Sequence, residues 1–139
     1  MKLIIGGAYQ GKLAYAQKRY EMEHGWIDGA VCDLKEIENC GGIFYFHEYV
    51  KRLLPLWEGK IQLNSIEQLA ETFAEELVSK NPRIVIVSNE LGYGIVPIEK
   101  SDRLWREVTG RICTSLAMRA DEVIRVVCGV GVQLKTKDS

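Results

Sequence analysis

The chain begins with Met1-Lys-Leu-Ile-Ile-Gly-Gly-Ala-Tyr-Gln-Gly-Lys12, and this stretch decides the fold that we expect. The apolar residues 3–5 are typical of a short buried strand, the glycines break it, and a helix-forming segment begins just after the lysine. Gly6, Gly11 and Lys12 fit the G-x-x-x-x-G-K pattern of a phosphate-binding loop in its strand–loop–helix setting. The backbone amides of such a loop bind anions, and the lysine adds a positive charge for the β- and γ-phosphates. We therefore predict a nucleotide-binding loop made of Gly6, Gly7, Ala8, Tyr9, Gln10, Gly11, Lys12 and Leu13.

The residue after Lys12 departs from the usual pattern of these loops. A serine or threonine at that place binds Mg²⁺ through its hydroxyl group, whereas this chain has Leu13. The alternative interpretation of the stretch is a glycine-rich turn between a strand and a helix, with a lysine there by chance. The pattern therefore favours phosphate binding more than it favours efficient catalysis.

The composition is that of an ordinary soluble globular protein, with 47% hydrophobic and 27% charged residues among 139, and we expect residues 1–139 to form one domain. A formal net charge of −1 favours neither nucleic acid nor an anionic membrane as a partner. No apolar run approaches the roughly 20 residues of a spanning helix, and the first residues do not form a signal peptide. The four cysteines form no C-x-x-C pair, which disfavours a zinc site or a disulfide framework. We expect a cytoplasmic protein.

The stretch that follows the first helix has weak patterns. The helix fades near Gly25, which would cap its C-terminus. A short strand over 29–34 would end near Asp33. Residues 43–46 form either another strand or the start of a helix that stops by Pro55.

The second half of the chain alternates strands and helices more clearly. The predicted elements are a helix that starts at the capping box of Ser65–Gln68 and closes at Asn81-Pro82, a β-branched strand over 83–88, a loop over 89–97, a helix over 101–120, and strands over 122–128 and 132–135. This alternation predicts a three-layer α/β fold with a mainly parallel sheet and a final strand pair. Ligands of such folds bind beyond the carboxyl ends of the strands, where the loops 6–12 and 89–97 both fall.

Two carboxylates are candidate metal ligands. Mg²⁺ prefers hard oxygen ligands, mostly carboxylates, waters and phosphates, and without a hydroxyl at position 13 the ion would depend on Asp33, Glu90 and water. Glu90 follows the β-branched strand and precedes a glycine-rich loop. Asp33 follows a short apolar stretch, and an ordinary loop aspartate is its alternative interpretation.

Several segments together resemble one known family. They are Gly6-Gly7-Ala8 with Gly11-Lys12, the string Ser-Asn-Glu-Leu-Gly-Tyr-Gly-Ile-Val-Pro over 88–97, Gly110, Leu116-Ala117, and Ala120-Asp-Glu-Val123. In these residues the chain is similar to the adenosylcobinamide kinase/adenosylcobinamide-phosphate guanylyltransferase family of the cobalamin pathway. The match covers residues 1–20 and about 66–135, and it is poor over 24–65.

The resemblance implies a RecA-like P-loop NTPase fold, often assembled as a trimer, with GTP or ATP, Mg²⁺ and a corrinoid as its ligands. It also implies two transferase reactions: phosphorylation of the cobinamide hydroxyl, and then transfer of GMP from GTP to that phosphate through a guanylylated histidine. Lys12 and Glu90 would serve catalysis beside the nucleotide. His47 is the candidate for the guanylylated histidine, because it precedes Arg52, Pro55 and Trp57 in an order loosely like that of the family.

The chain also departs from the family. Leu13 replaces the serine after the lysine, Cys113-Thr114 stand where members usually have Asn-Gln, and the segment 24–65 is too short for the histidine-bearing helix. A partly exposed surface residue is therefore the alternative interpretation of His47.

Three hypotheses for the function follow. The first is a cobalamin-pathway enzyme, a kinase with or without guanylyltransferase activity. The second is a shortened relative that binds a nucleotide without full catalysis and has a regulatory or scaffolding role, which Leu13 favours. The third, an unrelated small nucleotide kinase with a P-loop, is disfavoured by the string over 88–97.

Overall fold

The structure is a computed structural model that describes residues 1–22, 24–63, 65–91 and 99–137 of the chain. The elements, in order, are β1 (Lys2–Gly6), α1 (Lys12–Arg19), β2 (Trp26–Asp28), the 3₁₀ helix η1 (Leu34–Glu38), β3 (Gly42–Phe44), α2 (Phe46–Leu63), α3 (Ile66–Lys80), β4 (Val85–Asn89), α4 (Lys100–Arg119), β5 (Glu122–Val127) and β6 (Val130–Lys135).

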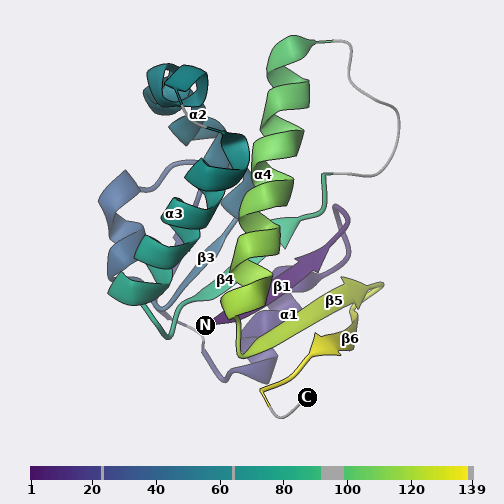
Figure 1. The fold of residues 1–139 in the computed structure, drawn as a ribbon. Helices are drawn as coiled ribbons and strands as arrows, with labels where there is room; N and C mark the ends of the chain where they lie inside the picture. Colours follow the sequence, from purple (N-terminus) through teal and green to yellow (C-terminus); the bar gives the residue numbers. More distant parts are fainter. Residues whose placement is uncertain (23, 64, 92–98, 138–139) are drawn as a thin grey trace.

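Six strands form one sheet in the order β2-β3-β4-β1-β5-β6. The pairs from β2 to β5 are parallel, and β6 pairs with β5 in the antiparallel direction. Figure 1 shows α2, α3 and α4 on one face of the sheet and α1 on the other. The three-layer α/β fold with a mainly parallel sheet and a C-terminal antiparallel pair is confirmed, and its arrangement is that of a P-loop NTPase.

The central strands are buried on both faces, which is why their sequences read as continuous apolar runs. In β1, Leu3 belongs to the core under α2, α3 and α4, and Ile4 belongs to the core under α1. In β4, Ile86 and Val87 alternate in the same way. Both strands therefore end at one edge of the molecule with little freedom to shift, and the loops that follow them start from fixed positions.

Two expectations for residues 20–34 are wrong, the cap at Gly25 and the strand that would end near Asp33. Helix α1 ends at Arg19 with Tyr20 as its C-cap, so Gly25 caps nothing. The strand expected over 29–34 is instead β2, which ends at Asp28, and Asp33 caps η1 in a reciprocal capping box with Glu36. The side chain of an aspartate competes well for backbone N–H groups, and this favours caps over strands.

The helix that was expected to stop by Pro55 continues to Leu63. A proline inside a helix removes one backbone hydrogen bond and usually bends or breaks the helix. Here Val50 and Leu53 are buried in the core before the proline, and the Trp57 ring meets Phe73 of α3 edge-on after it. These contacts on both sides of Pro55 stabilise the helix despite the backbone hydrogen bond that the proline removes.

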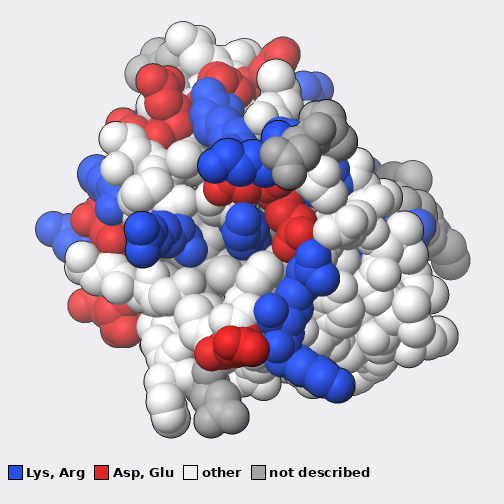
Figure 2. Space-filling model, turned by 90° about the horizontal axis from the view of Figure 1, so that it is seen from below, with Lys and Arg blue, Asp and Glu red and all other residues white. Residues whose placement is uncertain are grey.

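The second half of the chain agrees with the sequence more closely. The Ser65 hydroxyl accepts a hydrogen bond from the Gln68 backbone N–H at 3.1 Å, as its N-cap position requires. The four cysteines are free thiols. Among the described residues, no helix has the length and apolar character needed to cross a bilayer. Figure 2 shows lysine and arginine side chains interspersed with acidic ones on the face seen there, in keeping with the small net charge.

Candidate functional site

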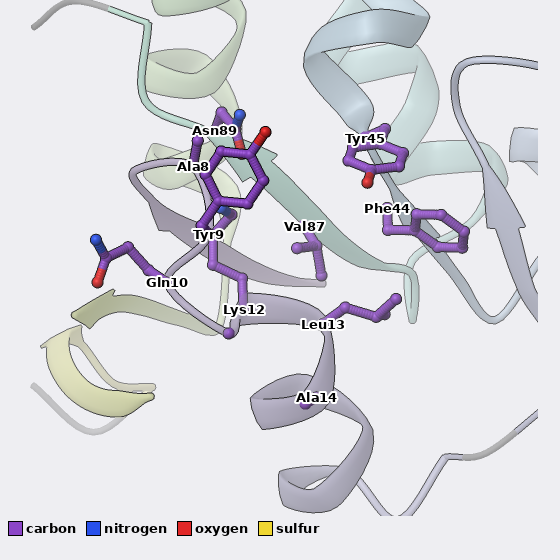
Figure 3. A pocket seen from close by; sticks show the side chains of 11 residues that line it. Ala8, Tyr9, Gln10, Lys12, Leu13, Ala14, Phe44, Tyr45, Val87 and Asn89 are labelled. Carbon is purple, nitrogen blue, oxygen red and sulfur yellow. The ribbon is translucent and has the colours of Figure 1, made fainter. Parts of the chain in front are cut away.

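A cavity of about 300 Å³ lies at the carboxyl ends of β1, β3 and β4 (Figure 3). Its lining residues are Ala8, Tyr9, Gln10, Gly11, Lys12, Leu13, Ala14, Phe44, Tyr45, Val87 and Asn89. The predicted loop therefore forms one wall, and the ends of two neighbouring strands form the other. Gly6 and Gly7 lie at the base of the loop, where their carbonyl oxygens accept hydrogen bonds from the Glu90 backbone N–H at 2.9 Å and from the Lys12 Nζ at 2.6 Å.

Glycine is required at two places in this loop. Gly11, the residue before α1, has a φ of +82°, a left-handed conformation that side chains rarely adopt. A Cβ at Gly6 would lie 2.5 Å from the backbone oxygen of Val126, so only glycine lets β1 end this close to β5.

Gln10 fastens the loop to the turn between β5 and β6. Its side-chain oxygen accepts a hydrogen bond from the Cys128 N–H at 2.5 Å, and its backbone oxygen accepts one from the Gly129 N–H at 2.8 Å. Cys128 and Gly129 both have positive φ, as in the tight turns that join hairpin strands. The loop is thus held in shape before any ligand arrives.

Lys12 is a buried cation at the floor of the cavity. Its residue is 8% exposed, and its ammonium group donates to the Gly7 carbonyl. Burial lowers the pKa of Lys12, and the negative charge of Glu90 partly opposes this effect. A cation held by a neutral carbonyl in a partly dehydrated place gains much from an anionic ligand.

Glu90 lies at the same edge of the sheet as Lys12, as predicted, but its side chain contacts β5 and does not line the cavity of Lys12. Its carboxylate accepts a hydrogen bond from the Arg125 Nε at 2.9 Å within an ion pair. Glu90 lines a second cavity of about 260 Å³ between β4 and α4 and does not line the first. Asn89 lines both cavities.

His47 is buried at the start of α2, with only 5% of its surface exposed, so its interpretation as a surface residue is wrong. Its Nδ1 accepts a hydrogen bond from the Asn89 backbone N–H at 3.1 Å, and its backbone oxygen accepts one from the Trp105 indole at 2.7 Å. Its ring meets the Tyr45 ring edge-on. Because Nδ1 is an acceptor, the neutral ring carries its proton on Nε2. His47 thereby fixes the end of β4 against the start of α2.

We expect stability to fall in acid because of His47. Burial, helped by the charge of Lys12, lowers the pKa of His47 to about 4, below the ordinary value of about 6.5 that the unfolded chain has. Between these values the unfolded state binds a proton that the native state does not, so the free energy of unfolding decreases as the pH falls. The loss by about pH 5 amounts to roughly 2 kcal/mol.

Urea unfolding at a series of pH values tests this expectation for the wild type and for His47→Gln, which cannot titrate. The variant should lose less stability than the wild type between neutral pH and about pH 5, by the roughly 2 kcal/mol assigned to the histidine. Parallel pH profiles for the two proteins would show that His47 is not buried as a neutral ring.

The structure does not bring the two predicted metal ligands together. Asp33 is exposed, and its carboxylate accepts the Lys35 N–H at the start of η1. Glu90 pairs with Arg125. Within the described ranges, no cluster of three or more histidine, cysteine, aspartate or glutamate side chains could hold a metal ion.

The sequence reasoning missed the wall opposite the loop. Phe44 and Tyr45 line the cavity from the end of β3, and Val87 lines it from β4. The short apolar run 43–46 was the available signal, because the carboxyl end of a parallel strand lies beside the ligand. Tyr9, which is fully exposed, and Tyr45 both have positive φ, and non-glycine residues held in this conformation concentrate at functional sites.

Comparison with known proteins identifies the family. The family described as "Cobinamide kinase / cobinamide phosphate guanyltransferase" matches residues 47–134, more than half of the chain. The chain belongs to this family. The bifunctional adenosylcobalamin biosynthesis protein CobU of Salmonella typhimurium is 47% identical over 53 residues, which are 38% of this chain and 29% of the relative. Its namesake from Escherichia coli is 45% identical over a segment with the same coverage.

The matched segment spans less than a third of the length of these two relatives. The family match begins at His47 and leaves out the loop from Gly6 to Lys12. A role of this loop in phosphate binding is therefore supported by the geometry of the loop and by the cavity that it shares with Asn89 in the matched part of the chain.

Proposed function

We propose that the chain binds GTP or ATP, with the phosphates in the cavity above Lys12, and acts in cobalamin biosynthesis as an adenosylcobinamide kinase. The observation that carries this proposal is a buried lysine inside a loop of backbone amides, at the carboxyl edge of a parallel sheet, in a member of this family. The same family membership supports a corrinoid as the acceptor.

In the proposed reaction the hydroxyl oxygen of the cobinamide attacks the γ-phosphorus of the nucleotide. The bond from that phosphorus to the bridging oxygen breaks, the nucleoside diphosphate leaves, and the hydroxyl proton passes to water. Phosphoryl transfer depends chiefly on positioning and on neutralising negative charge. Lys12 and the loop amides would neutralise the phosphates, while the apolar and aromatic side of the cavity, with Phe44, Tyr45 and Val87, would exclude water from the acceptor.

The second family reaction, guanylyl transfer, would use His47 as the acceptor of GMP in this proposal. One obstacle is that Nδ1 already accepts the Asn89 N–H and the proton then occupies Nε2. The ring would have to release Asn89, or lose its Nε2 proton to a base, before either nitrogen could attack the α-phosphorus. Glu90 would assist only after leaving Arg125.

The alternative is a nucleotide-binding relative with a regulatory or scaffolding role. The observation that favours it is Leu13, which lines the cavity at the position where the general loop pattern has a residue with a metal-binding hydroxyl. Cytoplasmic location and assembly as a homo-oligomer, a trimer by the family resemblance, complete the proposal. Light scattering of the purified protein tests the oligomer.

Transfer of radioactive phosphate distinguishes the two functions. With γ-labelled GTP or ATP and adenosylcobinamide, the kinase is expected to give labelled adenosylcobinamide phosphate, and Lys12→Met is expected not to. With α-labelled GTP, a label bound covalently to the wild type and absent from His47→Gln would identify the guanylylated residue. Nucleotide binding with neither product would favour the alternative, and no nucleotide binding would refute both.

A further inference from the structure

We propose that this loop binds nucleotide phosphates without a divalent cation, and that Leu13 is the residue that removes the need for one. The inference rests on the proposed nucleotide binding and goes beyond it, because it concerns the charge state of the ligand that the site accepts.

The donor set around the phosphate cavity does not suit Mg²⁺. This ion takes hard oxygen ligands and is usually held by one or two carboxylates together with phosphates and waters. No described aspartate or glutamate lines the cavity. The side-chain oxygens that do line it belong to two tyrosines and two amides, and the oxygen of Gln10 already accepts the Cys128 N–H. Residues 92–98, Gly-Tyr-Gly-Ile-Val-Pro-Ile, contain no carboxylate.

Four carboxylates near this edge have other partners or other positions. Asp28, at the end of β2, accepts the Ala30 N–H. Glu90 is 12% exposed at its side chain and is paired with Arg125. Asp33 caps η1. Glu48 directly follows His47 in α2, and it is not among the residues that line the cavity. If Glu90 bound a metal ion instead, its ion pair with Arg125 would be lost.

Leu13 places hydrocarbon where the metal-binding hydroxyl would stand. It is the second residue of α1 and half-buried, and Figure 3 shows its side chain extending toward the side of the cavity where Phe44 lies. With Phe44 and Val87 it forms an apolar wall. A hydrated cation beside this wall would lose water ligands that the wall cannot replace.

The charge of the site fits a metal-free nucleotide. Lys12 is the cation that lines the described cavity, and the amides and helix N-terminus behind it add partial positive charge. A nucleoside triphosphate that carries Mg²⁺ has two fewer negative charges than the free form, so it is attracted less strongly by a site that offers the metal no ligands. We therefore expect binding to be equal or tighter when the metal is removed.

Calorimetric titration of the full chain with GTP and with ATP, in excess EDTA and in saturating Mg²⁺, tests the inference. For the wild type the dissociation constants in the two conditions should differ by less than about threefold, or favour EDTA. Binding that is more than about threefold tighter with Mg²⁺ would overturn the inference and leave the proposed function standing. Absence of binding in both conditions would instead refute the proposed function.

Two variants isolate the hydroxyl group. Leu13→Thr adds the metal-binding oxygen, and Leu13→Val has nearly the same shape without it. We expect Leu13→Thr to acquire a preference for Mg²⁺ of about fivefold or more, and Leu13→Val, whatever its own affinity, to acquire no such preference. Equal behaviour of the two variants would show that Leu13 does not decide the metal requirement. Both substitutions fall on a half-buried helix position, and thermal unfolding checks that each variant is folded.

Discussion

Replacing Lys12 by methionine is expected to weaken GTP or ATP binding by about 10- to 100-fold while changing the free energy of unfolding by no more than about 1 kcal/mol. Hydrogen bonds between charged partners contribute about 1.5–3 kcal/mol, and the buried ammonium of Lys12 is placed to make them with a phosphate. Without a ligand, the same ammonium is held by the neutral Gly7 carbonyl, and its burial is unfavourable.

Methionine has a similar length and no charge. The substitution removes the unfavourable burial of a cation and also removes one hydrogen bond, and these two effects on stability oppose each other. Calorimetry measures the affinity, and urea unfolding measures the stability. Lys35→Met, at an exposed position on η1, is the matched control and should bind nucleotide as the wild type does. Unchanged affinity in Lys12→Met would mean that the loop is not the phosphate site. A large loss of stability would mean that the lysine has a structural role.

Gly6→Ala is expected to destabilise the protein by about 3 kcal/mol, the upper part of the range for overpacked interiors. Its Cβ would lie 2.5 Å from the Val126 backbone oxygen. This oxygen belongs to β5, which is paired with β1 up to the preceding residues. No side chain can rotate away to relieve the contact, so β1 and β5 have to separate where the loop begins.

Gly7→Ala is the control for this substitution. Its Cβ would meet only the Gln10 side chain, at 3.7 Å, and Gly7 is not at positive φ. The free energy of unfolding should therefore change by no more than about 0.5 kcal/mol. Equal stability of the two variants in urea would show that the contact between Gly6 and β5 does not limit the fold.

The sequence predicted one side of the candidate site and missed the other for a physical reason. The loop from Gly6 to Lys12 has its own local pattern, and β4 is a continuous β-branched run, so both could be recognised from the sequence. Phe44 is the last residue of β3 and Tyr45 follows it, and this strand of three residues is too short to show a period. The assignment of Asp33 to a strand end failed because β2 is equally short and ends at Asp28.

His47 illustrates what residue type alone leaves open. Judged from sequence alone, a histidine can lie on the surface, in a catalytic site or in the core, and the neighbouring residues in the chain do not distinguish these three positions. Burial under α4 and the hydrogen bond from Asn89, 42 residues away, decide its protonation and its role. Glu90 is similar, since its position at the strand end was predictable and its pairing with Arg125 was not.

The sequence by itself determined the parallel sheet, the glycines that shape the loop, and the absence of a hydroxyl at Leu13, because each depends on neighbouring residues or on the identity of one side chain. Tertiary structure alone decided that Lys12 is buried, that Glu90 turns to β5, that the helix continues past Pro55, and that an aromatic wall faces the loop. These features depend on contacts between strands and helices far apart in the chain, and such contacts leave no local pattern.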